Sequence, residues 1–253
     1  GSWYSRSNLL IAMTIAYQSI NLAKGEWGKK LQPLSQDRKR TLLEKLNKDQ
    51  LKAIDLCLND KQLNIIAGLP GVGKSTVLKV IVEETKKQSP RTEVFALSTS
   101  GKIVEQLAGD IANSQAKTLA SFSQAIKSKS LQLTKDSLVI VDEAGMVEDE
   151  HYYTLLNEVK RAGAKVILVG DDRQLSSVGR GDSFREILRR NTKQTVRINE
   201  IVRQRNDLLK ETVELMAGAG VSDEQYQKQV RSNDLVKKTF EDLEKKKMVN
   251  SYT

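Results

Sequence analysis

One segment of the chain carries the phosphate-binding pattern G-x-x-x-x-G-K-[S/T]. It consists of Gly68, Leu69, Pro70, Gly71, Val72, Gly73, Lys74 and Ser75, followed by Thr76. Glycines let backbone N–H groups wrap around phosphates, and the N-terminus of a following helix attracts their charge. Lys74 is expected to neutralise the β and γ oxygens, and the Ser75 hydroxyl to bind Mg²⁺. The pattern therefore predicts a site for ATP with Mg²⁺, after which Thr76 starts a helix.

A second candidate for chemistry is the acidic pair Asp142 and Glu143, which follows the apolar run 138–141. In open α/β sheets, ligands bind at the carboxyl ends of the strands. We expect Asp142 to hold Mg²⁺, directly or through water, and Glu143 to be the general base that activates the attacking water. An isolated Asp-Glu pair ordinarily caps a helix, but the phosphate loop about 70 residues upstream favours the catalytic interpretation.

The elements that must position these residues are visible in the hydrophobic pattern. Continuous apolar runs at 63–67, 94–97, 138–141 and 166–169 are typical of strands buried on both faces. A fifth strand is expected at 195–198. Helical patterns alternate with the strands, at 76–88, 102–113, 118–129 and 150–162, and further helices are expected near residues 9–20 and 42–58. The alternation predicts an α/β fold with a parallel sheet and crossover helices.

Composition limits the kinds of partner and the kinds of site that this chain can have. The 253 residues include 41 Lys and Arg against 32 Asp and Glu, a net charge of +9 that favours a polyanionic partner without proving one. Cys57 and His151 are the only residues of their types, so an internal disulfide and cysteine-based metal sites are excluded. We interpret His151 as a solvated or capping residue. A single cysteine fits a reducing, cytoplasmic location, and without an apolar run of about 18 residues no membrane partner is expected.

The sequences of these motifs resemble those of superfamily 1 DNA helicases of the RecD-like branch, most closely those in the helicase region of TraA-type conjugative relaxases. The resemblance covers roughly residues 45–217 and is carried by 68–76, 118–122, 141–147, 162–166, 170–175 and 200–205. It implies a RecA-like P-loop core that hydrolyses ATP. It also implies DNA unwinding or translocation on single-stranded DNA during plasmid transfer, with a relaxase or other conjugation proteins as further partners.

The resemblance also implies roles for single residues. Gln50 would recognise adenine, Gln174 would sense the γ-phosphate, and Arg203 would stabilise charge in the transition state. Contacts with single-stranded DNA are implied for Thr99, Ser100, Gly101, Lys102, Thr118, Ser121 and Phe122. Each role has a plainer alternative: Gln50 as a surface helix residue, Lys102 as a solvated lysine, and Arg203 as one phosphate contact in a basic stretch. Arg173 departs from the family pattern, in which an acid usually stands at that position.

The resemblance and the pattern together predict three segments. These are an N-terminal helical segment at 1–44, the ATPase core at 45–200, and a linker with C-terminal helices at 201–253. A second RecA-like core would need about 100–150 residues, more than follow Arg203, so we expect weak activity from this chain alone. We read Gly1-Ser2 as a remnant of expression, which suggests a piece of something longer. Two alternatives remain open: a RecD-like repair or recombination helicase fragment, and a non-catalytic ATP-binding DNA accessory module.

Overall fold

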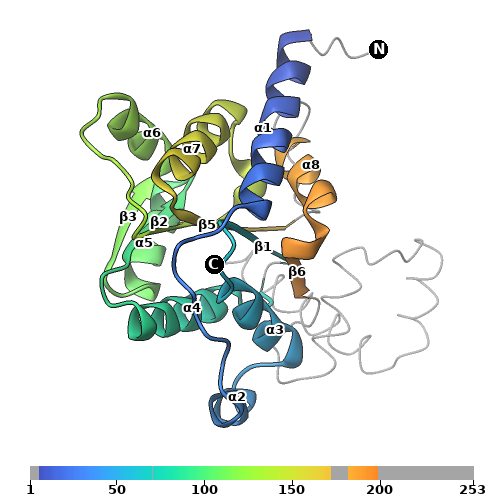
Figure 1. Cartoon of the computed structure of the whole chain (residues 1–253), viewed down its shortest axis with the longest axis vertical. Coiled ribbons are helices and arrows are strands. Elements are labelled where there is room, and N and C mark those ends of the chain that lie inside the picture. The colour runs from blue at the N-terminus through green and yellow to red at the C-terminus, as the bar shows by residue number, and fades with distance from the viewer. Residues whose placement is uncertain (1–5, 70, 172–181, 199–253) are drawn as a thin grey trace, which may run out of the picture. The chain divides into compact units, whose positions relative to one another are not determined.

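A parallel sheet forms the centre of the protein, as the alternating apolar runs predict (Figure 1). The computed structural model describes residues 6–69, 71–171 and 182–198, all of which belong to one compact unit, Gly1–Glu200. The strands within this part follow the order β3-β2-β4-β5-β1-β6. They are β1 Leu63–Gly68, β2 Glu93–Ser98, β3 Ser114–Thr118, β4 Ser137–Val141, β5 Lys165–Gly170 and β6 Thr195–Ile198. Every pairing is parallel, which confirms the predicted RecA-like α/β class.

The strand β3 was not predicted from the sequence. Its residues, Ser-Gln-Ala-Lys-Thr, lack the apolar run that marks the other strands, and none of them is fully buried. It pairs only with β2, from Val94↔Ser114 to Ser98↔Thr118, and so lies at the edge of the described sheet. An edge strand has one side without a strand neighbour, so a polar sequence is tolerated there.

Helices cover both faces of the sheet. Figure 1 shows α1, α6, α7 and α8 on one face and α3, α4 and α5 on the other. Their bounds are α1 Arg6–Lys24, α2 Gln36–Leu43, α3 Lys48–Cys57, α4 Lys74–Gln88, α5 Gly101–Asp110, α6 Leu119–Lys127, α7 Asp149–Ala162 and α8 Asp182–Arg190, with short 3₁₀ turns at Ala144–Met146 and Thr192–Gln194. The helices predicted after residue 200 lie outside the described residues.

The apolar stretch expected as one helix near 42–58 is divided between α2 and α3. Asn47 stands at the N-cap of α3, where its side-chain oxygen accepts a hydrogen bond from the backbone N–H of Gln50 at 2.8 Å. The side-chain oxygen of Gln50 in turn accepts from the backbone N–H of Asn47 at 2.9 Å. This reciprocal capping box starts a new helix, because it satisfies two backbone donors that the helix itself leaves free.

One hydrophobic core lies between the sheet and the layer formed by α1, α6, α7 and α8. Phe95 of β2 and Phe122 of α6 meet edge to face, with ring centroids 6.2 Å apart, and both are fully buried. Burial of each such side chain contributes roughly 1.5–3 kcal/mol to stability. Trp27 is also buried, and its indole N–H donates to the backbone oxygen of Lys135 at 2.9 Å.

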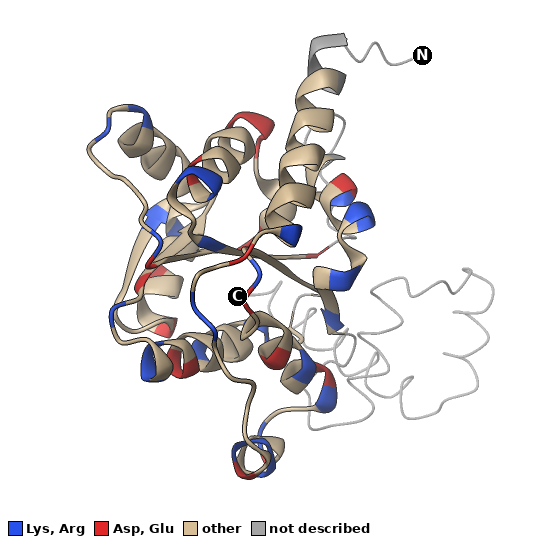
Figure 2. Ribbon diagram, in the orientation of Figure 1, with Lys and Arg blue, Asp and Glu red and all other residues tan. Residues whose placement is uncertain are grey.

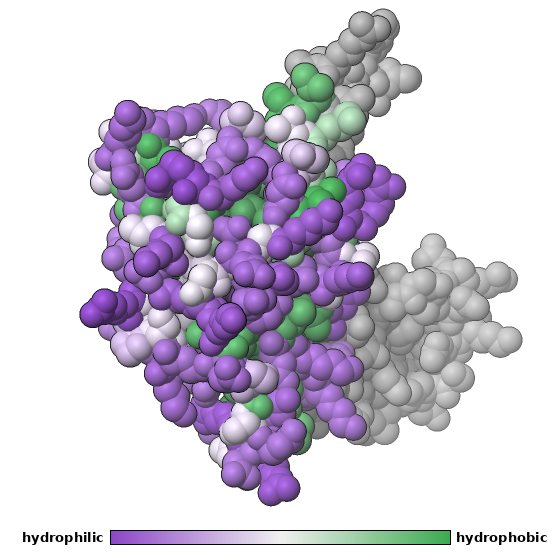
Figure 3. All heavy atoms as spheres, viewed as in Figure 1, coloured by the Kyte–Doolittle hydropathy of each residue, from purple (hydrophilic) through white to green (hydrophobic). Residues whose placement is uncertain are grey.

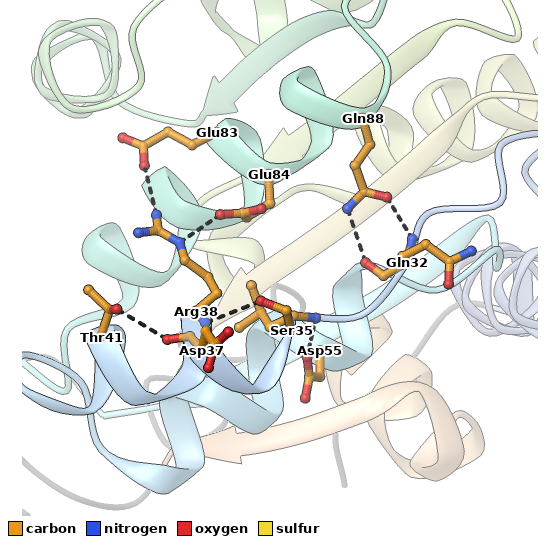
Figure 4. A network of polar contacts seen from close by, with 10 residues as sticks. Gln32, Ser35, Asp37, Arg38, Thr41, Asp55, Glu83, Glu84 and Gln88 are labelled. Atoms are coloured by element: carbon orange, nitrogen blue, oxygen red, sulfur yellow. Dashed lines mark hydrogen bonds and ion pairs between the residues drawn. The ribbon is translucent and has the colours of Figure 1, made fainter.

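The segment before β1 is bound to the helix that follows the phosphate loop (Figure 4). Arg38 of α2 donates from Nε to Glu84 of α4 at 2.8 Å, and Glu84 is almost fully buried. Gln32 and Gln88 exchange two further hydrogen bonds between backbone and side chain. These hydrogen bonds connect the N-terminal segment to the C-terminal half of α4.

Helix α1 packs against α7 and α8 through its C-terminal half. Asn191 donates from its side chain to the Ser19 hydroxyl at 2.9 Å, inside the protein. Further toward the N-terminus the helix exposes apolar side chains, visible at the top of Figure 3; Leu10 and Met13 are 67% and 58% exposed. None of the described helices combines the length and the apolar character that a membrane crossing requires.

Candidate nucleotide-binding site

The phosphate loop joins the end of β1 to the start of α4, as its sequence predicts. Gly71 and Gly73 have φ values of 85° and 80°, in the left-handed region that favours glycine. A Cβ at Gly73 would also lie 2.3 Å from Nε2 of Gln50. Within the described residues no side chain caps the N-terminus of α4, so the N–H groups of its first turn can bind an anion. Ser75 and Thr76 are exposed on that turn.

Lys74 holds its ammonium group over the loop. Its Nζ donates to the backbone oxygen of Gly68 at 2.7 Å and to that of Leu69 at 3.1 Å. A lysine in this position brings a full positive charge to the point where the loop amides converge. Such a charge fits the β and γ oxygens of a nucleoside triphosphate.

The acidic pair lies at the same edge of the sheet as the phosphate loop. The strand β5 lies between β4, which ends before Asp142, and β1, which ends in the loop. The register Val141↔Leu168 and Ala67↔Gly170 brings the carboxyl ends of the three parallel strands together. The Asp142 backbone N–H donates to the backbone oxygen of Leu97 at 2.8 Å, which ties the pair to β2 as well.

The charge of Lys74 acts on both carboxylates of the acidic pair. Burial raises the pKa of Asp142, while a hydrogen bond from the Glu143 backbone N–H and the charge of Lys74 oppose that rise. Burial and then the charge of Asp142 raise the pKa of Glu143, and Lys74 again acts in the opposite direction. A carboxylate whose pKa is raised is a stronger base, which favours Glu143 as the group that accepts a proton from water.

The donor set fits MgATP. Ser75 offers an exposed hydroxyl on the first turn of α4, and Asp142 offers a carboxylate; both are the oxygen ligands that Mg²⁺ prefers. The uncapped helix start, the two left-handed glycines and the Lys74 ammonium supply the complementary anion site. Pro70, in the middle of the loop, lies outside the described residues.

Gln50 lies beneath the phosphate loop and is only 1% exposed, so the alternative of a surface helix residue is wrong. Its Nε2 donates to the backbone oxygen of Val72 at 2.9 Å, and its Oε1 accepts from Asn47. The side chain thus connects the start of α3 to the loop, a role that the sequence did not reveal. Contact between Gln50 and adenine stays a prediction.

The residues predicted to contact DNA come together at the carboxyl ends of β2 and β3. Because these strands are neighbours, with Ser98 paired to Thr118, the segments 99–102 and 118–121 follow adjacent strand ends. Thr99, Gly101, Lys102 and Ser121 are exposed and Ser100 is partly exposed. Thr118 caps α6, accepting from the Ser121 backbone N–H at 3.1 Å.

Phe122 is a correction to that set. Its side chain is fully buried against Phe95, within the core that α6 closes over the sheet. A ring in that position stabilises the fold and does not reach a DNA strand. The spacing of Leu119, Phe122 and Ile126 along α6 is the amphipathic pattern that indicates burial.

Two further predicted residues, Gln174 and Arg203, lie outside the described residues, as does Arg173. The described basic residues that precede Arg203 lie on α8, on β6 and in the turn between them, where blue segments gather in Figure 2; they are Arg185, Arg189, Arg190, Lys193 and Arg197. Glu186 binds Arg189 at 2.9 Å and Arg190 at 3.1 Å, so part of this positive charge is already paired. His151 is partly buried, and its Nδ1 lies 3.0 Å from the Ser123 hydroxyl.

Fold and site together define a P-loop nucleotide-binding α/β domain. The chain belongs to the AAA domain family, which matches residues 45–238. Conjugal transfer protein TraA of Rhizobium radiobacter is 31% identical over 183 residues, which are 72% of this chain and 16% of that protein. Multifunctional conjugation protein TraI of Escherichia coli K12 is 26% identical over 183 residues, 70% of this chain and 10% of that protein.

The same fold occurs in the Pif1 helicase from Candida albicans. That structure aligns with a TM-score of 0.50 at 18% identity, over 71% of this chain and 45% of the helicase chain. The family match and the relatives confirm the resemblance to TraA-type conjugation proteins, and the alignment with Pif1 confirms the fold. Assignment to the RecD-like branch stays a prediction.

Proposed function

We propose that this domain is the ATP-hydrolysing motor core of a DNA helicase that acts in conjugative plasmid transfer. One observation carries the proposal: the neighbouring parallel strands β1, β5 and β4 bring the phosphate loop with Lys74 and the acidic pair Asp142 and Glu143 to one edge of the sheet. This combination of an anion site, oxygen ligands and a base is what water-driven cleavage of a γ-phosphate requires. The similarity to proteins named for conjugal transfer supports the biological setting.

In the proposed mechanism the loop amides and Lys74 bind the phosphates, and Ser75 and Asp142 hold the metal. Mg²⁺, when bound, neutralises charge that develops on the β and γ oxygens. Glu143 accepts a proton from the attacking water as the oxygen of that water bonds to the γ-phosphorus. The bond from the γ-phosphorus to the bridging oxygen breaks, and the electron pair leaves with ADP. Glu143 suits this step because its environment raises its pKa.

The remaining roles extend the proposal to DNA. The exposed residues of segments 99–102 and 118–121 contact the backbone of single-stranded DNA, Gln174 senses the γ-phosphate, and Arg203 stabilises the transition state. An arginine that stabilises the transition state in this way contributes about 10³–10⁵ in rate. A relaxase or another conjugation protein in the cytoplasm would be the partner.

The test is steady-state MgATP hydrolysis with and without a single-stranded oligonucleotide, at several salt concentrations. Lys102→Ala removes an exposed lysine at the proposed DNA surface, whereas Lys160→Ala removes one from the last turn of α7, far along the chain from that surface. We expect stimulation by DNA in the wild type and in Lys160→Ala. In Lys102→Ala, DNA binding should weaken, and the slope of the logarithm of the binding constant against the logarithm of the salt concentration should fall by about one. Equal stimulation in all three proteins would remove Lys102 from the DNA site, and no hydrolysis in any of them would refute the enzymatic role.

A further inference from the structure

The backbone of Glu143 adopts a conformation that side chains rarely take. Its φ and ψ are 54° and 44°, in the left-handed region. Among the described residues other than glycine, Asn113 and Lys129 share a positive φ, but both lie in loops that carry no proposed chemistry. A glutamate in this region is strained, and it stays there only where the surrounding structure enforces it. The enforcing contacts therefore decide where the carboxylate of Glu143 points.

Hydrogen bonds fix the turn on both sides of Glu143. Its N–H donates to the Asp142 carboxylate at 2.8 Å, and its backbone oxygen accepts from the Met146 N–H at 2.9 Å. The next carbonyl, that of Ala144, accepts a hydrogen bond of 2.5 Å from the hydroxyl of Tyr152. Both Ala144 and Tyr152 are fully buried, so no water competes for this bond.

Gly170, the last residue of β5, also lies close to the backbone of this turn. A Cβ at Gly170 would lie 3.2 Å from the backbone nitrogens of both Ala144 and Gly145. A side chain at this position would fit only if the turn moved by a few tenths of an ångström. The turn is thus confined between the last residue of β5 and the side chain of Tyr152.

Tyr152 itself has a fixed place. It belongs to the first turn of α7, where the Asp149 carboxylate accepts a hydrogen bond from the Ser183 hydroxyl of α8 at 2.5 Å. Burial, with the nearby charge of Asp149, raises the pKa of Tyr152 well above its ordinary value. The hydroxyl therefore keeps its proton and remains a donor to Ala144.

We propose that Tyr152 is a positioning residue for ATP hydrolysis: its hydroxyl holds the Ala144 carbonyl and thereby keeps Glu143 in the left-handed conformation that aims its carboxylate at the γ-phosphate. The inference rests on the proposed function, because it needs Glu143 to be the base. Tyr152 does not touch the nucleotide. It acts through the backbone of the turn, which couples the first turn of α7 to the hydrolytic step.

The kinetic test compares Tyr152→Phe with Tyr153→Phe, its neighbour on α7, which is 46% exposed. Tyr152→Phe removes one buried hydroxyl and should lower kcat for MgATP about tenfold to a hundredfold with KM unchanged, because small displacements of a catalytic group have effects of that size. Tyr153→Phe should match the wild type. In a Glu143→Gln background, single-turnover measurements should show no further loss from Tyr152→Phe. A loss of equal size in both backgrounds, or a rise in KM alone, would overturn the proposal.

A second measurement does not depend on turnover. Hydrogen exchange of the backbone amides in 143–147 should be faster in Tyr152→Phe than in the wild type and unchanged in Tyr153→Phe. Unchanged exchange in Tyr152→Phe would overturn the claim that the hydroxyl holds the turn. If exchange rises as expected but the wild type does not hydrolyse ATP, the proposed function fails while the role of Tyr152 in fixing the turn stands.

Discussion

The stability of this domain should rise with pH above neutrality because of one buried lysine. Lys165, the first residue of β5, is 1% exposed, and burial lowers its pKa from 10.5 to about 8. Its Nζ donates to the backbone oxygen of Asn59 at 2.7 Å and lies 5.5 Å from the ring centroid of Trp27. At about 1.4 kcal/mol per pKa unit, the shift means that folding with Lys165 charged costs about 3 kcal/mol.

The sign follows from the protons that each state binds. Between the folded pKa of about 8 and the unfolded pKa of 10.5, the unfolded chain holds a proton on Lys165 that the folded protein has released. The free energy of unfolding therefore rises with pH across this window. Cys57 acts in the opposite direction, because burial raises its pKa from 9.0 to about 12 and the folded protein keeps a proton that the unfolded chain loses.

The assay is urea unfolding followed by tryptophan fluorescence, in a Cys57→Ala background that removes the opposing group. Between about pH 8 and about pH 10 the free energy of unfolding should rise by about 2 kcal/mol. The same background with Lys165→Met should lack that rise. If both proteins respond equally to pH, Lys165 is not the group responsible, and the reasoning from its burial is refuted.

Three further predictions concern the site. Gly73→Ala should weaken ATP binding at least about tenfold in a fluorescent-nucleotide titration, because φ is 80° and the new Cβ would meet Gln50, whereas Gly28→Ala, with open space around it, should bind normally. Gln50→Ala leaves the Val72 carbonyl without its partner and should lower the free energy of unfolding by about 1–3 kcal/mol; an unchanged thermal midpoint would contradict this. Hydrolysis should fall at acidic pH, since protonation of Glu143 removes the base, and the acid limb of the kcat profile should lie above the ordinary glutamate pKa of 4.5; an acid limb at or below 4.5 would contradict the raised pKa.

Most of the sheet could be predicted because its strands are buried on both faces. The runs in β2, β4 and β5 are continuously apolar, and the run in β1 is interrupted only by Asn64; such runs are typical of buried strands and of buried helices. The polar strand β3 could not be found in this way. It forms by pairing with β2 at the edge of the sheet, and its own residues carry no apolar run that would indicate a strand. The division between α2 and α3 was encoded locally, in the Asn47 and Gln50 capping box, and could have been recognised.

In the site, the residues that could be predicted from the sequence are those that nucleotide binding and hydrolysis require at fixed positions of a motif. Lys74 and Asp142 belong to such patterns, and the structure brings them to one edge of the sheet. Tyr152 could not be identified from the sequence. Its hydroxyl contacts the Ala144 carbonyl because of the conformation of the turn between them, and no residue spacing specifies that conformation. Phe122 was misinterpreted because a motif resemblance was given more weight than the apolar face of α6.

The central claim is that the phosphate loop binds ATP while Glu143 activates the water that cleaves it. The most direct measurement determines both the ATP dissociation constant and the single-turnover hydrolysis rate for the wild type and for Glu143→Gln. We predict a dissociation constant within about threefold of the wild type and a hydrolysis rate lower by about a hundredfold or more, because a general base contributes about 10²–10⁴ in rate. Equal hydrolysis rates in the two proteins would contradict the account.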